Sequence, residues 1–403
     1  MPEPSDAPAA EKFIVLRTVA DKTSGGPVMR GGPRAEGTTT LEMGSAELDQ
    51  HEVENLENDP EVVSLAPVMP LTLHEPVARD ADSDEDSRVA WGIQAVGADS
   101  SPFDGTGITV AILDTGIDID HAAFSGVNVI RRDFTGEGDD DVNGHGTHCA
   151  GTVFGQDTNG VRIGVAPGVE KALIGKVLGS TGNGSTDGIL SAIEWAVDEG
   201  AQVISMSLGL DFPRLVRQLV EREGFPIELA TSNALERYAA NLDVFRSLAE
   251  YATARSELRG GGAVIVAAAG NASRRDLNPK HEIAVAPPAA AKGVISVGAL
   301  ASAANGFSVA PFSNTRAKVC GPGVGVRSAK QGGGLVAMNG TSMATPHVAG
   351  IAALWAQRQL QTLGRIDSYS LAAQVVANST HKGLVPGFRP PDVGSGLVQA
   401  PKE

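Results

Sequence analysis

The sequence predicts an α/β fold, a mostly parallel sheet covered by helices on both faces. Apolar runs of strand length alternate along the chain with stretches of helical periodicity, a pattern typical of parallel sheets between helix layers. The 49 glycines among 403 residues suit many tight strand-to-helix connections. The expected strands cover 108–113, 172–178, 202–207, 263–269 and 294–299, and the expected helices cover about 145–155, 186–199 and 342–358.

A small α+β domain is expected to precede this fold, over residues 1–76. A charged, apolar-poor segment at 77–88 predicts a solvated linker, and the larger domain then covers 89–403. Within the small domain the expected strand, helix and second strand lie at 11–18, 46–56 and 59–65, with a Gly/Pro-rich insertion at 24–37.

The strand expected at 108–113 is followed directly by Asp114 and then by a threonine and a glycine. Open α/β sheets bind and react with ligands at the carboxyl ends of their strands. Asp114 is therefore a candidate functional acid, although a lone aspartate at a strand end is more often a structural cap.

His145 stands between two glycines at the start of an expected helix. Small neighbours allow close backbone approach and hold an imidazole in place, so His145 is a candidate base. His148 follows one helical turn later, and a metal-binding H-x-x-H pair is the alternative. Without a third ligand, a buried and hydrogen-bonded His148 is the preferred interpretation.

Ser342 lies between a glycine turn and a helix of small residues. Pro346 is tolerated only near the start of a helix, which puts Ser342 at the positive N-terminal end. An acid, a base and a hydroxyl, each at the end of an element, predict a nucleophilic triad of Asp114, His145 and Ser342.

These motifs, in the order Asp, His, Ser, resemble the subtilisin-like serine proteases from about Ala90 to about Ala400. The matching segments are Asp114-Thr115-Gly116, His145-Gly146-Thr147-His148, Gly340-Thr341-Ser342-Met343-Ala344-Thr345-Pro346 and Ala267-Ala268-Ala269-Gly270-Asn271. The resemblance implies a serine endopeptidase in which Ser342 attacks the scissile carbonyl, His145 carries the proton and Asp114 holds the imidazole. It also implies that Asn271 and the Ser342 backbone N–H bind the oxyanion.

By the same resemblance, residues 1–76 are similar to an inhibitory prodomain. The chain is therefore expected to be a self-processing zymogen. Its strand at 68–74 is expected in the substrate groove, with the cut between about Leu71 and Pro76. The alternative is an unrelated accessory domain. The acidic linker lies beyond this cut.

Substrate contacts also follow from the resemblance. The expected substrate-binding residues are Asn183, Gly184, Ser207, Leu208, Gly209 and Ala272, with Thr186 and Ile189 at a further pocket. An uncharged, apolar substrate side chain is expected before the cut. The segment 210–262 has helical spacing and is longer than relatives need, so it is interpreted as an insertion that adds packing or shapes substrate entry.

The composition excludes some partners. A net charge of −16 disfavours nucleic-acid binding, and no run is long and apolar enough to span a membrane, so polypeptides and the prodomain are the expected partners. Two cysteines, Cys149 and Cys320, are too few for a disulfide framework, with a single bridge as the alternative. The first residues lack signal-peptide features, which predicts a cytoplasmic protein; a trimmed start or unconventional export is the alternative.

No cofactor is expected for the chemistry, and no metal ligands are assigned. Many relatives are stabilised by calcium, but Ala123 stands where an aspartate is often found. The run Asp139-Asp140-Asp141 is interpreted as a solvated charge run in preference to a cation site. A catalytically silent binding protein would lack a triad or oxyanion residue, and none is lacking. A transferase with the same acyl-enzyme chemistry remains an alternative.

Overall fold

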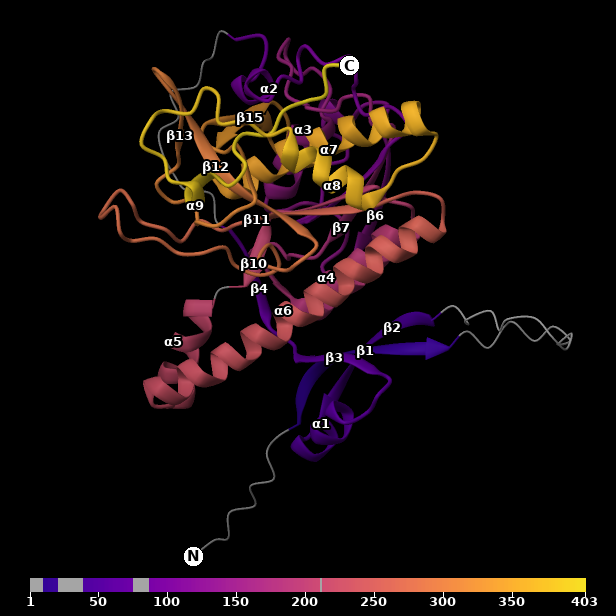
Figure 1. Ribbon diagram of the computed structural model, residues 1–403, viewed down its shortest axis with the longest axis vertical. Coiled ribbons are helices and arrows are strands. Elements are labelled where there is room, and N and C mark those ends of the chain that lie inside the picture. Colours follow the sequence, from indigo (N-terminus) through magenta and orange to yellow (C-terminus); the bar gives the residue numbers. More distant parts are fainter. Residues whose placement is uncertain (1–9, 21–38, 75–86, 211) are drawn as a thin grey trace, which may run out of the picture.

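The computed structural model describes residues 10–20, 39–74, 87–210 and 212–403. The Gly/Pro-rich insertion at 24–37 and most of the linker expected at 77–88 lie outside these ranges. The described residues form a large α/β body and a small N-terminal domain, which lies against one long helix of the body (Figure 1).

An eight-stranded sheet forms the centre of the body, in the order β13-β12-β11-β9-β5-β7-β6, with β14 beside β12. The pairings are parallel except for the antiparallel pair β12–β13. Its strands are β5 (Thr109–Asp114), β6 (Asn128–Asp133), β7 (Lys171–Lys176), β9 (Val203–Met206), β11 (Val264–Ala268), β12 (Val294–Ala303), β13 (Gly306–Val309) and β14 (Val319–Pro322).

The five strands expected from apolar runs are β5, β7, β9, β11 and β12. Strand β6 was not expected because its sequence is polar and partly exposed, as suits an edge strand. The predicted class, a mostly parallel sheet with helices on both faces, is confirmed by the topology.

Side chains of β5 alternate between two cores, one on each face of the sheet. Val110 and Ile112 belong to the same core cluster as the buried side chains of α3 (His145–Phe154) and α7 (Thr341–Leu363). Ala111 and Leu113 belong to the cluster that contains those of α4 (Thr186–Asp198) and α6 (Ile227–Leu258). Burial on both faces explains why β5 reads as a continuous apolar run.

Shorter elements complete the body. They are α2 (Trp91–Ala95), the 3₁₀ turn η1 (Ala122–Phe124), the hairpin of β15 (Val326–Ala329) and β16 (Leu335–Met338), α8 (Ser368–Ala377) and α9 (Pro390–Val393). In the described ranges, none of the helices combines the length and the apolar character needed to cross a membrane.

The N-terminal domain is an antiparallel sheet, with β1 (Glu11–Ala20) between β2 (Thr39–Leu48) and β3 (Val62–Pro67), and the helix α1 (Gln50–Glu57). The helix expected at 46–56 was wrong at its start. Residues 46–48 end β2 and pair with β1, and Asp49 caps α1 in a reciprocal pair with Glu52. Strand pairing therefore overrides the helical spacing of those residues.

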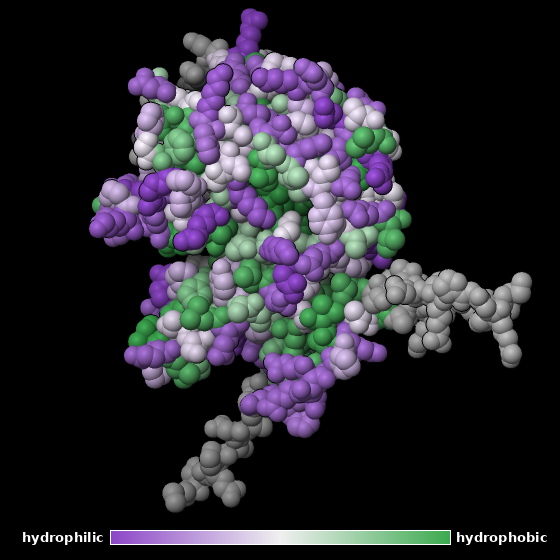
Figure 2. Space-filling model, viewed as in Figure 1, coloured by the Kyte–Doolittle hydropathy of each residue, from purple (hydrophilic) through white to green (hydrophobic). Residues whose placement is uncertain are grey.

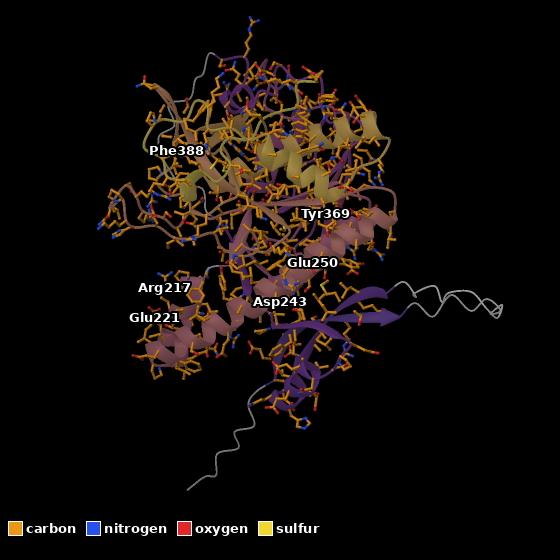
Figure 3. All side chains as sticks on the ribbon, in the orientation of Figure 1. Arg217, Glu221, Asp243, Glu250, Tyr369 and Phe388 are labelled. Atoms are coloured by element: carbon orange, nitrogen blue, oxygen red, sulfur yellow. The ribbon has the colours of Figure 1, made fainter. Side chains whose placement is uncertain are left out.

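The insertion expected at 210–262 forms two helices, α5 (Phe212–Glu223) and the 32-residue α6. Helix α6 runs between the N-terminal domain and the central sheet (Figure 1). Buried Asn241 of α6 donates to the carbonyl of Pro67 at 3.0 Å, and Arg237 pairs with Glu11. Ser64 approaches Asp243, which is labelled on α6 in Figure 3, at 3.3 Å. The insertion thus provides packing for the N-terminal domain.

The chain leaves the N-terminal domain as β4 (Pro70–Leu73), which joins a separate antiparallel sheet on the body. Strand β4 lies between β10 (Leu208–Leu210) and β8 (Asn183–Ser185). The segment therefore lies where an extended substrate is expected.

Candidate active site

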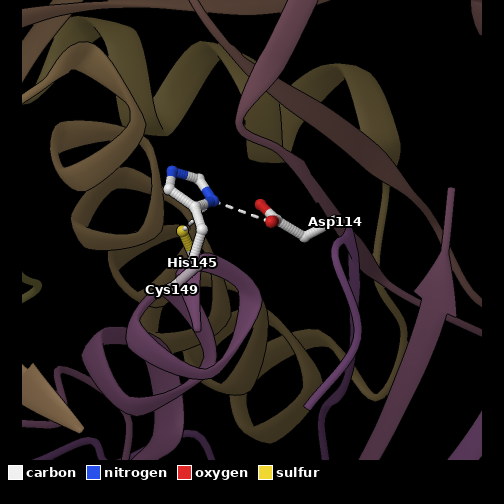
Figure 4. Close-up of side chains that lie close together, drawn as sticks. All are labelled: Asp114, His145 and Cys149. Carbon is white, nitrogen blue, oxygen red and sulfur yellow. Dashed lines mark hydrogen bonds and ion pairs between the residues drawn. The ribbon is translucent and has the colours of Figure 1, made fainter. Parts of the chain in front are cut away.

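Asp114, the last residue of β5, and His145, the first residue of α3, form a buried pair. His145 Nδ1 lies 2.7 Å from Asp114 Oδ1 (Figure 4). The same carboxylate oxygen accepts from the backbone N–H of Thr115 at 2.8 Å. This contact holds the imidazole with Nδ1 toward the carboxylate and leaves Nε2 without a hydrogen-bond partner among the described residues.

The loop after β5 and the start of α3 are in close backbone contact. A Cβ on Gly146 would lie 2.2 Å from the carbonyl oxygen of Gly116, so only glycine fits there. The N–H of Gly146 donates to Thr115 Oγ1 at 2.8 Å. This is the close approach that the flanking glycines predicted.

Asp141 is buried and holds the loop after β5 against the start of α3. The interpretation of 139–141 as a solvated charge run was therefore wrong for Asp141. Its side chain is only 3% exposed. Its two oxygens accept from Thr115 Oγ1, from the N–H groups of Asn143 and Gly144, and from the N–H and hydroxyl of Thr147, at 2.6–3.1 Å. Asp140 remains exposed and pairs with Arg131 at 2.8 Å. The three aspartates differ, and sequence alone could not tell which is buried.

The pKa values of the two histidines of α3 are shifted in opposite directions. Burial, the largest single effect, lowers the pKa of His145, but the charge and hydrogen bond of Asp114 together with the neighbouring Cys149 outweigh it, so the net pKa is raised well above 6.5. Burial lowers the pKa of His148 to about 3. His148 Nε2 donates to the Val326 carbonyl oxygen at 2.9 Å, so His148 is the buried, hydrogen-bonded residue expected.

Ser342 is the second residue of α7 and is fully buried. Its Oγ lies 3.3 Å from the carbonyl oxygens of Ser207 and His74. Cys149 Sγ lies 3.8 Å from His145 Nδ1 and 3.5 Å from the Ser342 carbonyl oxygen, so the three side chains occupy one site. Burial raises the pKa of the Cys149 thiol. Cys149 and Cys320 are both free, without the single bridge that was the alternative.

Asn271 also contacts the carbonyl oxygen of His74. Its Nδ2 donates to the His74 carbonyl oxygen at 3.2 Å. Its Oδ1 accepts from the N–H and the hydroxyl of Thr341, both at 2.9 Å, which fixes the orientation of the amide. Thr341 was not predicted as a site residue, although it lies beside Ser342 in the quoted motif.

The expected substrate-binding residues lie along β4. Leu71 and Thr72 pair with Gly184 and Asn183 on one side, and Leu71, Thr72 and Leu73 pair with Leu210, Gly209 and Leu208 on the other. Ser207 Oγ donates to the Ser342 carbonyl oxygen at 3.0 Å. Ala272 lines a cavity beside His74.

Thr186 and Ile189, which were expected at a further pocket, lie close to the start of β4. Thr186 Oγ1 accepts from the N–H of Met69 at 2.9 Å. Ile189 belongs to the same buried cluster as Leu71. Thr186 therefore contacts the region of the chain that precedes the cut expected between Leu71 and Pro76, and Ile189 lies in the core cluster that this region joins.

One cluster of side chains among the described residues was tested as a possible calcium site. Among them, the one group of three His, Cys, Asp or Glu side chains close enough to share an ion is Asp114, His145 and Cys149. Calcium prefers six to eight oxygen ligands, and this group supplies one carboxylate with a nitrogen and a sulfur. Its geometry matches a hydrogen-bonded acid and base instead, and subtilases require no cofactor for catalysis.

Comparison with known proteins agrees with this geometry. The sequence model of the subtilase family matches residues 105–386. The chain is 35% identical over 363 residues to alkaline elastase YaB of Bacillus sp. (strain YaB), covering 88% of this chain and 78% of the relative. It is 31% identical over 324 residues to M-protease of Shouchella clausii (strain KSM-K16), covering 79% and 70%.

A fungal relative is similar over a smaller share of its length. Subtilisin-like protease 1 of Trichophyton rubrum is 32% identical over 324 residues, covering 76% of this chain, which spans about half of that relative (53%). The cytoplasmic location expected from the first residues gains no support from these relatives. The chain belongs to the subtilase family and is a subtilisin-like serine endopeptidase.

Proposed function

We propose that this chain is the zymogen of a serine endopeptidase that cuts itself between His74 and Glu75. The observation that carries the proposal is the position of the His74 carbonyl oxygen, 3.2 Å from Asn271 Nδ2 and 3.3 Å from Ser342 Oγ. A donor and a nucleophile that converge on one carbonyl are what acyl transfer requires.

The residues then take the following roles. Ser342 Oγ attacks the carbonyl carbon, and its proton passes to His145 Nε2. The oxyanion is bound by Asn271 Nδ2 and the backbone N–H of Ser342, while Asp114 holds the imidazole and stabilises its charged form. His145 gives the proton to the leaving amine, which leaves an ester on Ser342. Water, deprotonated by His145, hydrolyses that ester and restores the serine.

Self-processing follows from the path of β4. The strand pairs on both edges through its backbone, as a bound polypeptide does, and this backbone pairing is itself independent of the side chains. After the cut, residues up to His74 keep this pairing and the contacts of the N-terminal domain with α6. The released domain is therefore a product inhibitor and a partner of the enzyme, and the catalytic domain expected at 89–403 follows the linker.

The test compares the wild-type chain with Ser342→Ala on a denaturing gel and by intact mass. Wild-type protein yields two fragments, cleaves an unfolded protein and gains the mass of a fluorophosphonate probe. Ser342→Ala remains one full-length chain and does none of these. Ser302→Ala, an exposed serine on β12, is the matched control and behaves as wild type.

Three results would contradict the proposal in whole or in part. Processing or probe labelling that survives in Ser342→Ala would remove Ser342 from the nucleophile role. Products that carry an added amine or alcohol, in place of free carboxylates, would favour the transferase alternative. If the released N-terminal fragment does not inhibit the mature enzyme, residues 1–76 are an accessory domain instead.

A further inference from the structure

The insertion forms one wall of a cavity that opens beside His74. The cavity measures about 590 Å³, within the usual range for ligand pockets. One wall comes from the body, with Asn271, Ala272 and 283–286, and the facing wall comes from Phe212, Pro213, Leu235 and Tyr238 of α5 and α6. The space-filling view is notched at this level, between α5 and the body above it (Figure 2).

Three consecutive residues at the end of this segment, Thr72 and Leu73 of β4 and the following His74, line the cavity. P1 to P4 denote substrate residues counted from the cut bond toward the N-terminus, so His74 is P1 and Leu71 is P4. The side chains of Leu71 and Leu73 belong to the buried core, whereas those of Thr72 and His74 are only partly buried. Successive side chains of a strand point to opposite sides, so P1 and P3 face the cavity together.

The walls of the cavity are apolar on the insertion side. Phe212 and Tyr238 pack edge to face with ring centroids 5.9 Å apart. Leu235 lies one helical turn before Tyr238 and is 54% exposed, and Ile283 is exposed across the opening. Among the described residues that line the cavity, Arg274 is the one Lys, Arg, Asp or Glu. Exposed large apolar side chains around a cavity indicate a binding site.

We propose that the α5–α6 insertion extends the P1 pocket to the P3 side chain, so that the enzyme selects polypeptides with a large apolar or aromatic residue at P3 as well as at P1. The proposal rests on the assignment of the active site to Ser342 and Asn271. Thr72 and His74 leave the cavity largely open, so the chain's own processing site is not the sequence that fills it best.

The test measures kcat/KM of the processed enzyme for quenched peptides that copy residues 69–78, with only P3 and P1 varied. Burying an aromatic side chain in place of a methyl group is expected to raise kcat/KM at least ~10-fold at each position. Peptides with Phe at P1 and P3 are therefore cleaved faster than those with Ala at both, and faster than the natural pair of Thr and His.

Two variants distinguish the loss of this pocket from a general loss of activity. Leu235→Ala and the pair Leu235→Ala with Tyr238→Ser lower the preference for Phe at P3 while cleavage of the Ala–Ala peptide is kept. Leu229→Ala changes nothing, because Leu229 is an equally exposed leucine of α6 (52%) that does not line the cavity. If the pair also slows the Ala–Ala peptide, the single Leu235→Ala variant decides.

Two outcomes would reject the pocket proposal and leave the protease assignment intact. One is Ser342-dependent cleavage with equal kcat/KM for all peptides, and the other is a P3 preference that is unchanged in Leu235→Ala. Failure of every peptide to be cleaved in a Ser342-dependent way would reject both the assignment and the pocket.

Discussion

The amide nitrogen of Asn271 lies 3.2 Å from the carbonyl oxygen of His74, a residue 197 positions earlier in the chain. The amide cannot rotate freely, because its oxygen accepts two hydrogen bonds from Thr341. A donor fixed before the reaction costs little reorganisation in the transition state, which is the basis of oxyanion stabilisation.

Replacing Asn271 with alanine is expected to lower kcat by roughly 10²–10³-fold with little change in KM, as for the oxyanion asparagine of subtilisin. The reason is that the hydrogen bond strengthens as negative charge develops on the oxygen. Steady-state kinetics on one peptide measure both constants. A loss confined to KM would assign Asn271 to ground-state binding.

Thr341→Val tests how the amide is held. The variant keeps the backbone N–H that reaches Asn271 Oδ1 but loses the hydroxyl. The hydroxyl also accepts from the N–H of Gly270 at 3.1 Å, so two hydrogen bonds are lost. The one that holds the amide contributes about 1 kcal/mol, so kcat is expected to fall by about 5–10-fold. Thr341→Ser, which keeps the hydroxyl, is the control and retains most activity. Equal losses in both variants would point to packing instead of the hydrogen bond.

Processing is expected to cut one peptide bond, the bond between His74 and Glu75. Because the His74 carbonyl oxygen lies between Asn271 and Ser342, the mature protein begins at Glu75. Intact mass and N-terminal sequencing of the larger fragment identify this residue. A first cut at another bond between Leu71 and Pro76 would mean that β4 shifts its register against β8 and β10 before the reaction.

The pH dependence follows from His145. Only the neutral imidazole accepts a proton from Ser342, and Asp114 raises the His145 pKa well above 6.5 despite the opposing effect of burial. Activity is therefore lost as pH falls below that pKa, and kcat/KM rises with pH through a value above 6.5. Asp114→Asn removes the raising charge, so the rising limb moves to lower pH while the rate itself drops by roughly 10⁴-fold. A rising limb below 6.5 in the wild-type enzyme would contradict the assignment.

Asp141 supports a prediction on stability. Asp141→Asn places an NH₂ group among five donors in a buried site, which is expected to cost roughly 3 kcal/mol in the free energy of unfolding. Asp140→Asn, next to it but with an 86% exposed side chain, is the matched control and costs little. Denaturant unfolding of both variants on a Ser342→Ala background avoids self-digestion. Equal stability of the two would mean that the loop tolerates the lost charge.

The sequence alone was sufficient to predict five strands of the central sheet and to select the candidate site residues. Strands buried on both faces read as continuous apolar runs, so β5, β7, β9, β11 and β12 were predictable, while polar β6 was not. Asp114, His145, Asn271 and Ser342 were recognised because each stands in a local motif at the end of an element.

Only the tertiary structure decided which of these residues contact one another and what they face. Hydrogen bonds between distant segments, such as Asn271 to His74, leave no periodic signal in the sequence. The difference between buried Asp141 and exposed Asp140 arises from the loop that folds around one of them. Likewise, a helical pattern at 227–258 predicts a helix, but that Leu235 and Tyr238 line the cavity beside His74 depends on where the helix packs.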